Sequence, residues 1–398
     1  MLRRPPALVA AVLAVLTLAT AACTSAKSNT NAQPARAASP AGPSKFFSQT
    51  EFDRQMAERR IAPQGDPNTP WLQTIQPSMV DTTKYVKPGT PPKWHLCFSN
   101  ASVDNPWRVT GFTTMQAEVK LHPEIGEFTV LDAKGNDDKQ IADLADLQTR
   151  NCSAIIVSPN TTDALTPQVQ RVCQSGVPVI VFDRGVTTDC PVSFVHPIGG
   201  YAFGADSAEF IALKAGKGGK VLAIRLVPGV DVLENRWAAA KAIFDREGVN
   251  VVGVEFNNAD PAKAKTIVSD YLRRFGKLDG VWLDAGATSV AVAEAFQDAG
   301  KPVPPLDSED QQDFLALWQK KNLTAIAPTY PVYQWRTAII AATDILSGKP
   351  VPKEWILPQP VITSDTLTDY VTPGMPALFY STCGCQKMAG FPQGWGGK

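Results

Sequence analysis

In the stretch VPVIVFDRGVTTDC (residues 177–190), an apolar run ends abruptly at two opposite charges. Residues 179–182 are all aliphatic or aromatic, which is typical of a strand buried on both faces of a parallel sheet. Asp183 and Arg184 follow at once. Ligands of open parallel sheets bind beyond the carboxyl ends of the strands, so this charged pair predicts the edge of a binding cleft.

The same alternation extends along most of the chain. Short aliphatic runs, each separated from the next by a helical pattern or a loop, occur as WHLCFSN, FTVLDA, AIIVSP, PVIVFDR, KVLAIRLV, VVGVEF, GVWLDA and LTAIAP. Glycines stand where the C-caps of the helices are expected, at Gly176, Gly248, Gly276, Gly300 and Gly348. The pattern predicts an α/β protein with parallel sheets, divided near residue 199 into two lobes of similar design. Residues 300–322 are predicted to be mainly a loop.

The N-terminus predicts an export signal. Arg3 and Arg4 precede an apolar run at residues 7–22, which is too short and too rich in Ala for a good membrane span. Residues 24–45 are poor in large apolar side chains and predict a flexible tether. The end of the signal resembles the lipobox of bacterial lipoproteins, although Thr20 stands where an aliphatic residue is usual. The resemblance implies lipidation of Cys23 and anchoring to the outer face of the cell membrane, with plain secretion as the alternative.

Composition excludes several function classes. The 398 residues include 38 Lys and Arg and 38 Asp and Glu, so there is no basic field for nucleic acid. The three histidines are scattered, and nothing suggests a bound metal or cofactor. A G-x-S-x-G elbow and a P-loop are both missing from the sequence. An enzyme is therefore not expected; the enzyme alternative is a glycosidase-like pair of aspartates.

Six cysteines remain besides Cys23, and an exported protein can pair all of them. Their connectivity does not follow from the sequence. A bond between Cys152 and Cys173 is favoured, because both are expected at one sheet edge. Cys97 is expected to be a small buried side chain without a partner. The remaining three are Cys190, Cys383 and Cys385; the CGC motif favours a disulfide over a metal site.

The residues that follow the predicted strands have the composition of a carbohydrate site. Aromatic rings lie against the C–H faces of sugars, while carboxylates accept from and guanidinium groups donate to hydroxyl groups. These residues could also have roles that involve no ligand. Trp107 could be a core residue, Asp183 and Arg184 could form a structural ion pair between the lobes, and Arg236 could be a solvated helix residue. Glu234 is interpreted as a surface residue and Thr329 as part of a hinge. The complete set is Asn105, Trp107, Arg108, Ser158, Asp183, Arg184, Glu234, Arg236, Asp284, Asp310, Thr329 and Tyr330.

Several segments resemble a known family. SNASVDNPWR, LQTRNCSAIIVSP, SGVPVIVFDR and ENRWAAAKAIF resemble the ribose-type, class B sugar-binding proteins of ABC transporters, and residues 79–101 resemble the start of actinobacterial lipoprotein members. The resemblance covers about residues 79–348. It implies a periplasmic-binding-protein-like type I fold, with two Rossmann-like lobes joined by a three-segment hinge and closing on one monosaccharide-sized sugar. It also implies an ABC permease as partner.

The resemblance further implies which residues bind the ligand. Arg108 replaces a second aromatic residue, as in relatives that take furanose sugars with a WR pair. Asp284 replaces the usual Asn-Asp step and PTYP replaces a hinge glutamine, so ribose itself is not the expected ligand. Ser158 and Tyr330 are added from their positions after strands. The residues carried over are Asn105, Trp107, Asp183, Arg184, Arg236, Asp284 and Asp310.

The predicted organisation follows from these segments. It comprises a signal peptide (1–22), a lipid-anchored tether (23–45), an N-terminal extension (46–92), lobe 1 (93–198 and 329–357) and lobe 2 with a C-terminal tail (199–328 and 358–398). The tail after Tyr380 matches nothing in the resemblance. The predicted function is the extracytoplasmic substrate-binding component of a carbohydrate ABC importer, acting as a monomer. The alternative is a sugar sensor that presents its ligand to a membrane receptor or kinase.

Overall fold

The computed structural model describes residues 46–64, 69–87 and 93–398. The predicted signal peptide, Cys23 and the tether lie outside these residues. Among the described residues, no helix is long and apolar enough to cross a membrane.

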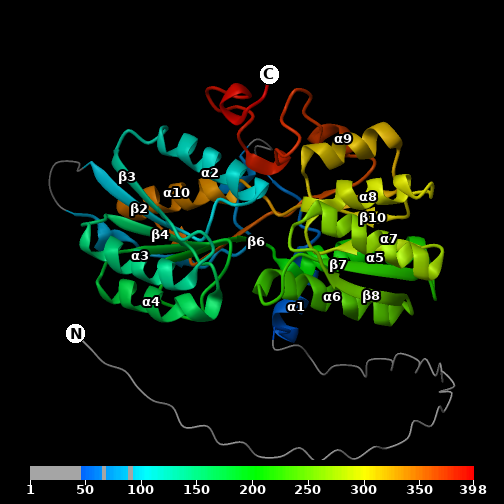
Figure 1. Cartoon of the computed structure of the whole chain (residues 1–398). Coiled ribbons are helices and arrows are strands. Elements are labelled where there is room, and N and C mark those ends of the chain that lie inside the picture. Colours follow the sequence, from blue (N-terminus) through cyan, green and yellow to red (C-terminus); the bar gives the residue numbers. More distant parts are fainter. Residues whose placement is uncertain (1–45, 65–68, 88–92) are drawn as a thin grey trace, which may run out of the picture. The chain divides into compact units, whose positions relative to one another are not determined.

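Lobe 1 is built on a six-stranded parallel sheet (Figure 1). Its strand order is β3-β2-β4-β5-β6-β13. The strands are β2 (Trp94–Asn100), β3 (Ile125–Asp132), β4 (Ala154–Ser158), β5 (Val179–Phe182), β6 (Ser193–Pro197) and β13 (Glu354–Leu357). The helices are α2 (Pro106–Val119), α3 (Asp137–Thr149), α4 (Thr162–Gln174) and α10 (Gln334–Leu346).

The strand β5 is buried on both faces, as its apolar sequence predicts. Val179 and Val181 pack with the core residues of α3 and α4. Ile180 and Phe182 point to the opposite face and pack with residues of α2 and α10, among them Trp335. Because side chains alternate along a strand, a run without polar residues needs helices on both sides of the sheet.

Lobe 2 has a second six-stranded sheet, in the order β8-β7-β9-β10-β11-β14, in which β14 alone pairs antiparallel. Its strands are β7 (Lys220–Arg225), β8 (Asn250–Phe256), β9 (Gly280–Leu283), β10 (Leu306–Asp307), β11 (Ala325–Pro328) and β14 (Val361–Ile362). Its helices are α5 (Gly200–Ala215), α6 (Asp231–Glu247), α7 (Pro261–Phe275), α8 (Ser289–Asp298) and α9 (Gln312–Lys321). The predicted α/β architecture is confirmed.

The prediction of a loop at residues 300–322 is wrong, because this segment contains β10 and α9. The strand β10 has only two residues, so it leaves no periodic pattern. The helix α9 is polar on much of its surface and buries Phe314, Leu315 and Trp318. Because β10 was not predicted, the sequence pattern does not indicate which of the two acids after it, Glu309 or Asp310, lies near Arg236.

The chain passes between the two sheets three times, as predicted. The passages are the segments 198–199, 329–333 and 358–360, which follow β6, β11 and β13. The residue boundaries proposed for the lobes stay a prediction.

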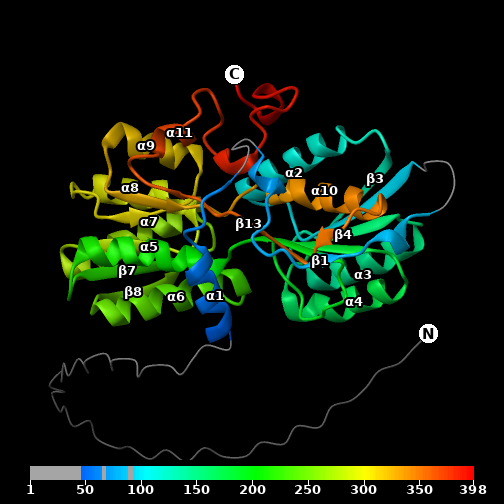
Figure 2. The ribbon, with the colours of Figure 1, turned by 180° about the vertical axis from the view of Figure 1, so that it is seen from behind.

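The N-terminal extension and the C-terminal tail add shorter elements (Figure 2). Helix α1 (Gln49–Glu58) packs on α5, where Phe47 and Phe52 surround the ring of Tyr201 at 5.7 Å. Strand β1 (Met79–Val80) pairs with β12 (Val351–Pro352). The others are η1 (Pro70–Leu72), η2 (Thr83–Tyr85), α11 (Leu367–Tyr370), η4 (Ser381–Cys383) and η5 (Gln393–Trp395).

All six cysteines of the described residues form disulfides, but not in the favoured pairing. The bonds join Cys97 to Cys152, Cys173 to Cys190 and Cys383 to Cys385, with Cα–Cα distances of 5.8, 5.9 and 5.1 Å. The favoured bond between Cys152 and Cys173 is wrong, and Cys97 is buried but not unpaired. The sheet order explains this, because β2 and β4 are neighbours and place Cys97 beside the start of β4. The disulfide role expected for the CGC motif is confirmed.

The close packing of α5 on α6 depends on Gly204, where a Cβ atom would collide with the carbonyl oxygen of Arg236. We expect Gly204→Ala to lower the free energy of unfolding by about 3 kcal/mol, because two rigid helices must move apart. Gly394→Ala is the matched control, since a Cβ there meets nothing within 4 Å. Urea denaturation checks the prediction, and equal stability of the two variants would refute it.

Candidate functional site

Arg108 forms hydrogen bonds with three polar side chains at the carboxyl ends of the lobe 1 strands. Its Nη2 donates to Asp183 Oδ2 at 2.6 Å, and its Nη1 donates to Ser158 Oγ at 3.2 Å and Asn100 Oδ1 at 3.4 Å. The Ser158 hydroxyl also donates to Asp183, at 3.3 Å. Burial lowers the pKa of Arg108, and the Asp183 carboxylate opposes this effect. Three predicted site residues are therefore joined in one buried network.

Asn105 sets the position of Arg108. It is the N-cap of α2, and its side-chain oxygen accepts from the backbone N–H of Arg108 at 3.0 Å. Pro106 occupies the first helical position, which suits a helix start. The Asn105 side chain therefore has a structural role in this structure, and a ligand contact from it stays a prediction.

The alternative of a structural Asp183–Arg184 ion pair is wrong, because Asp183 pairs with Arg108. Asp183 has a positive φ of 70°, a conformation that Asp tolerates better than most residues. After this turn the side chain of Arg184 does not pair with Asp183. Instead, Arg184 Nη1 donates to the carbonyl oxygen of Asn160. Arg184 lines a cavity of about 380 Å³ that also involves residues 229–231 of lobe 2.

Tyr330 links the two lobes. Its hydroxyl donates to the carbonyl oxygen of Asp183 at 3.1 Å, while its own carbonyl accepts from Trp107 Nε1 at 2.7 Å. The rings of Trp107 and Tyr330 are 5.6 Å apart. Burial, with a smaller contribution from Asp183, raises the pKa of Tyr330 well above its ordinary value. Trp107 is only 9% exposed and belongs to the hydrophobic core of lobe 1, and stacking on a ligand stays a prediction.

Arg236 of α6 is the centre of the corresponding group in lobe 2. Its Nη1 donates to Glu309 Oε1 at 2.8 Å and to the Asp284 carbonyl oxygen at 2.6 Å. Its guanidinium carbon lies 3.8 Å from the ring centroid of Phe203 and 4.9 Å from that of Tyr330. The alternative of a solvated helix residue is wrong, because Arg236 is 2% exposed.

One donor of Arg236 is left unsatisfied. Its Nε is buried and has no hydrogen-bond partner among the described residues. Leaving a buried donor without a hydrogen bond destabilises a protein by about 1–3 kcal/mol. An acceptor on a ligand would offset this loss. The unpaired Nε is therefore free to meet an acceptor, and a ligand contact from Arg236 stays a prediction.

Glu309, and not the predicted Asp310, is the acid that pairs with Arg236, and a ligand contact from Asp310 stays a prediction. Asp310 turns toward the C-terminal tail, where its Oδ2 accepts from Thr382 N at 2.6 Å and Thr382 Oγ1 at 2.7 Å. Burial raises the pKa of Asp310 to about 6. Glu309 and Asp310 are neighbours just beyond β10, and their side chains reach different partners, Arg236 and Thr382. The prediction missed Glu309, although an acid directly beside Asp310 was a visible signal.

The carboxylates of Asp284 and Glu234 both pair with Arg225 and not with Arg236. The Asp284 carboxylate accepts from Leu226 N at 2.6 Å and from Arg225 Nε at 3.4 Å. Glu234 pairs with Arg225 at 3.0 Å and is largely buried, so its interpretation as a surface residue is wrong. Burial, opposed by the charge of Arg225, raises the pKa of Asp284 to about 7. A ligand contact from the Asp284 side chain stays a prediction.

The raised pKa of Asp284 predicts a pH dependence. An unfolded Asp has a pKa near 3.9, so between about pH 4 and 7 the folded state binds more protons and the free energy of unfolding falls as pH rises. We expect Asp284→Asn to reduce this slope by the share of one group, which reaches about 1.4 kcal/mol per pH unit. Asp310, whose pKa burial raises to about 6, contributes the same sign in both proteins. His196, whose pKa burial lowers to about 4, contributes the opposite sign in both proteins. Urea denaturation at pH 5 and pH 8 measures the difference; an unchanged pH dependence in the variant would contradict it.

His95 lies beside the Cys97–Cys152 disulfide, and the three ligand atoms are within 4.8 Å of one another. Metal ions bind cysteine as the thiolate, which an oxidised pair does not offer. With the disulfide formed, His95 is the one residue of this cluster that still offers a metal ligand.

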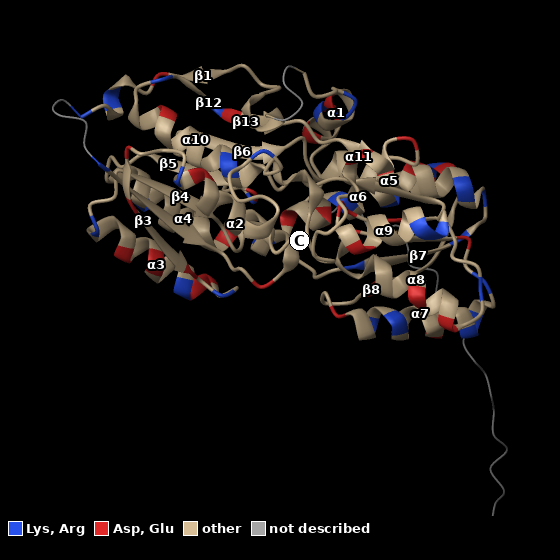
Figure 3. Ribbon diagram, turned by 90° about the horizontal axis from the view of Figure 1, so that it is seen from above, with Lys and Arg blue, Asp and Glu red and all other residues tan. Residues whose placement is uncertain are grey.

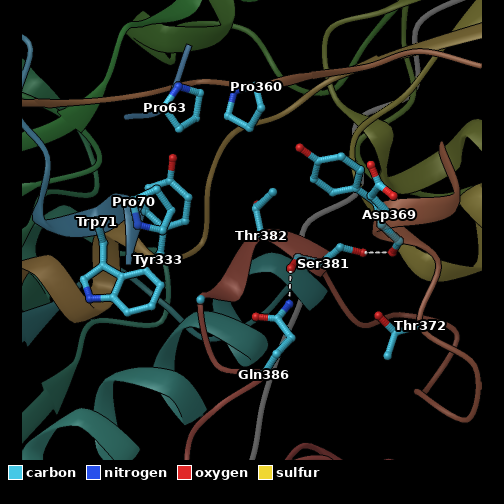
Figure 4. Close-up of a pocket in the computed structure, with 12 residues that line it drawn as sticks. Pro63, Pro70, Trp71, Tyr333, Pro360, Asp369, Thr372, Ser381, Thr382 and Gln386 are labelled. Carbon is cyan, nitrogen blue, oxygen red and sulfur yellow. Dashed lines mark hydrogen bonds between the residues drawn. The ribbon is translucent and has the colours of Figure 1, made fainter. Parts of the chain in front are cut away.

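A further cavity of about 410 Å³ lies beside the hinge (Figure 4). Trp71 and Tyr333 line it together with Pro360, Thr382 and Gln386. None of the predicted ligand-binding residues lines this cavity. Charges of both signs are mixed over the helices of both lobes (Figure 3), in agreement with the balanced composition.

Comparisons with known proteins agree with this architecture. Residues 96–350 match the family model described as periplasmic binding protein domain. The chain is 26% identical over 277 residues to the ribose import binding protein RbsB of Bacillus subtilis (strain 168), covering 69% of this chain and 90% of that protein. The xylitol-binding protein of Mycolicibacterium smegmatis is 21% identical over 231 residues, covering 57% of this chain and 66% of that protein. The crystal structure of an ABC transporter solute binding protein from Bacillus halodurans C-125 with bound myo-inositol superposes with a TM-score of 0.65 at 20% identity, covering 71% of this chain and 99% of that one.

Proposed function

This chain belongs to the periplasmic binding protein domain family, an extracytoplasmic family, and from that premise we propose that it is the substrate-binding component of a carbohydrate ABC importer. One observation carries the proposal. Two arginine–carboxylate pairs, Arg108 with Asp183 and Arg236 with Glu309, stand at the carboxyl ends of the two sheets on either side of Tyr330.

The chemistry of these pairs suits a neutral polyhydroxylated ligand. Carboxylates accept from hydroxyl groups and guanidinium groups donate to them, in charge-assisted bonds roughly twice as strong as neutral ones. The charges of the two pairs cancel, so the site does not demand a charged ligand. Trp107 and Tyr330 supply apolar ring surface for the C–H face of a sugar.

We propose a ligand of pentose or hexose size, either a sugar or a polyol. Two relatives are named for ribose and for xylitol, and a similar structure contains bound myo-inositol. All three molecules belong to this class. Asp284 faces Arg225, and Tyr330 stands in the hinge segment PTYP. Both positions differ from the ribose-type pattern that the sequence resembles, so ribose itself is not our first candidate.

The mechanism follows from the hinge. The sugar binds the polar groups of one lobe while the lobes are apart, and rotation about the three connecting segments brings the other lobe onto it. The closed form then docks on a membrane permease. We propose that Cys23 anchors the protein by a lipid, that it acts as a monomer, and that it performs no catalysis.

A thermal-shift screen of residues 46–398 against pentoses, hexoses, sugar acids, polyols and inositols tests the proposal. A ligand at a hundred times its dissociation constant adds about 2.7 kcal/mol of stability, which raises the unfolding temperature by several degrees. We expect one chemical class to give this shift. If no compound shifts the unfolding temperature, the proposal fails.

A further inference from the structure

The C-terminal strap, residues 379–395, lies beyond the segment that the family model matches. It is fastened to lobe 2 by backbone hydrogen bonds. Gln312 N donates to the Phe379 carbonyl oxygen at 2.9 Å, and Ser381 N donates to the Asp310 carbonyl oxygen at 3.1 Å. Gln311 and Tyr380 form an antiparallel bridge. The strap therefore runs along the segment that carries Glu309 and Asp310.

The same strap is fastened to lobe 1. Trp395 Nε1 donates to Thr114 Oγ1 of α2 at 3.0 Å, and Tyr333 N donates to the Thr382 carbonyl oxygen at 2.9 Å. Cys383, Cys385 and Trp395 belong to the hydrophobic core of lobe 1. The strap therefore contacts both lobes (Figure 1).

Tyr380 connects the strap to the Arg236–Glu309 pair. Its hydroxyl donates to Glu309 Oε2 at 3.2 Å, and the side chain is 2% exposed. Oε2 also accepts from Gly286 N at 3.2 Å, while Oε1 accepts from Arg236. Both oxygens of this buried carboxylate are thus held in place, and Tyr380 supplies one of the two donors to Oε2.

We propose that Tyr380 is a positioning residue of the sugar site, which fixes the carboxylate of Glu309 and thereby sets the choice between sugar epimers. The inference rests on the proposed function. A site discriminates strongly between hydroxyl configurations only when its buried acceptors are held in one orientation. Without the hydroxyl of Tyr380, the Glu309 carboxylate keeps a single donor on Oε2 and gains freedom to rotate.

Titration calorimetry with the strongest ligand of the screen and with one of its epimers tests this role. We expect Tyr380→Phe to weaken binding of the preferred sugar about tenfold, equivalent to about 1.4 kcal/mol, and to weaken the epimer less. Tyr370→Phe is the matched control, because its ring lines the hinge cavity and Glu309 does not contact it. This control should bind both ligands as the wild-type protein does.

A double-mutant cycle separates positioning from a general structural effect. If Tyr380 acts through Glu309, then adding Tyr380→Phe to Glu309→Gln should change the affinity less than twofold. Wild-type affinity of Tyr380→Phe for both epimers, or an equal loss for both, would overturn the inference while leaving the proposed function intact. If the wild-type protein binds no sugar, both the proposed function and the inference are wrong.

Discussion

Replacing Asp183 by alanine is expected to abolish tight sugar binding and to lower the free energy of unfolding by about 3–5 kcal/mol. The change removes the carboxylate that Arg108 Nη2 contacts at 2.6 Å, and Arg108 is 2% exposed. Its remaining partners, Ser158 and Asn100, are neutral. A buried guanidinium without a counter-charge destabilises the fold, and the ligand loses an acceptor at the centre of the site.

Calorimetry with the ligand of the screen and urea denaturation measure the two effects of Asp183→Ala. Asp183→Asn should regain part of the stability, because an amide oxygen still accepts from Arg108. Asp365→Ala, at an exposed position, should change neither quantity. Wild-type affinity in Asp183→Ala would show that the site is assigned to the wrong place.

Removing the Cys97–Cys152 disulfide by changing both residues to alanine is expected to lower the free energy of unfolding by about 4 kcal/mol, since the bond closes a long loop in the unfolded chain. The two cysteines are 55 residues apart in sequence and connect β2 to the start of β4. This loss should reduce the order of the central strands, which end at the Arg108 network.

The Cys383–Cys385 bond offers a control of the same chemistry, because both of its residues are fully buried and only 2 positions apart. A loop this short constrains the unfolded chain far less, so the second double variant should lose less than half as much stability. Urea denaturation without reductant compares the two. An equal or smaller loss for the Cys97 and Cys152 variant would contradict the prediction.

Local sequence patterns were sufficient for the two lobes and for the segments that carry the candidate site. The strand at residues 179–182 could be predicted because burial on both sheet faces excludes polar residues over its whole length. Arg236 and Asp183 could be placed near the cleft because each follows a predicted strand. These inferences depend on neighbours along the chain, which the sequence displays directly.

The errors concern partners that are far apart in sequence. Asp183 pairs with Arg108, 75 positions away, although Arg184 is its neighbour in sequence. The choice between Glu309 and Asp310 depended on β10, a strand too short to produce a pattern. The contact of Tyr380 with Glu309 spans 71 positions and involves a tail beyond residues 96–350, which the family model matches. Such pairings are determined by the topology of the sheets and not by local composition.

A crystal structure with the ligand identified in the screen would show directly whether a sugar binds between the two lobes. We predict electron density for one sugar between the lobes, with hydroxyl groups within 3.2 Å of Asp183 or Arg108 on one side and of Arg236 or Glu309 on the other, a distance typical of hydrogen bonds. Density in the hinge cavity of Figure 4, beside Trp71 and Tyr333, with none between the lobes, would contradict the account.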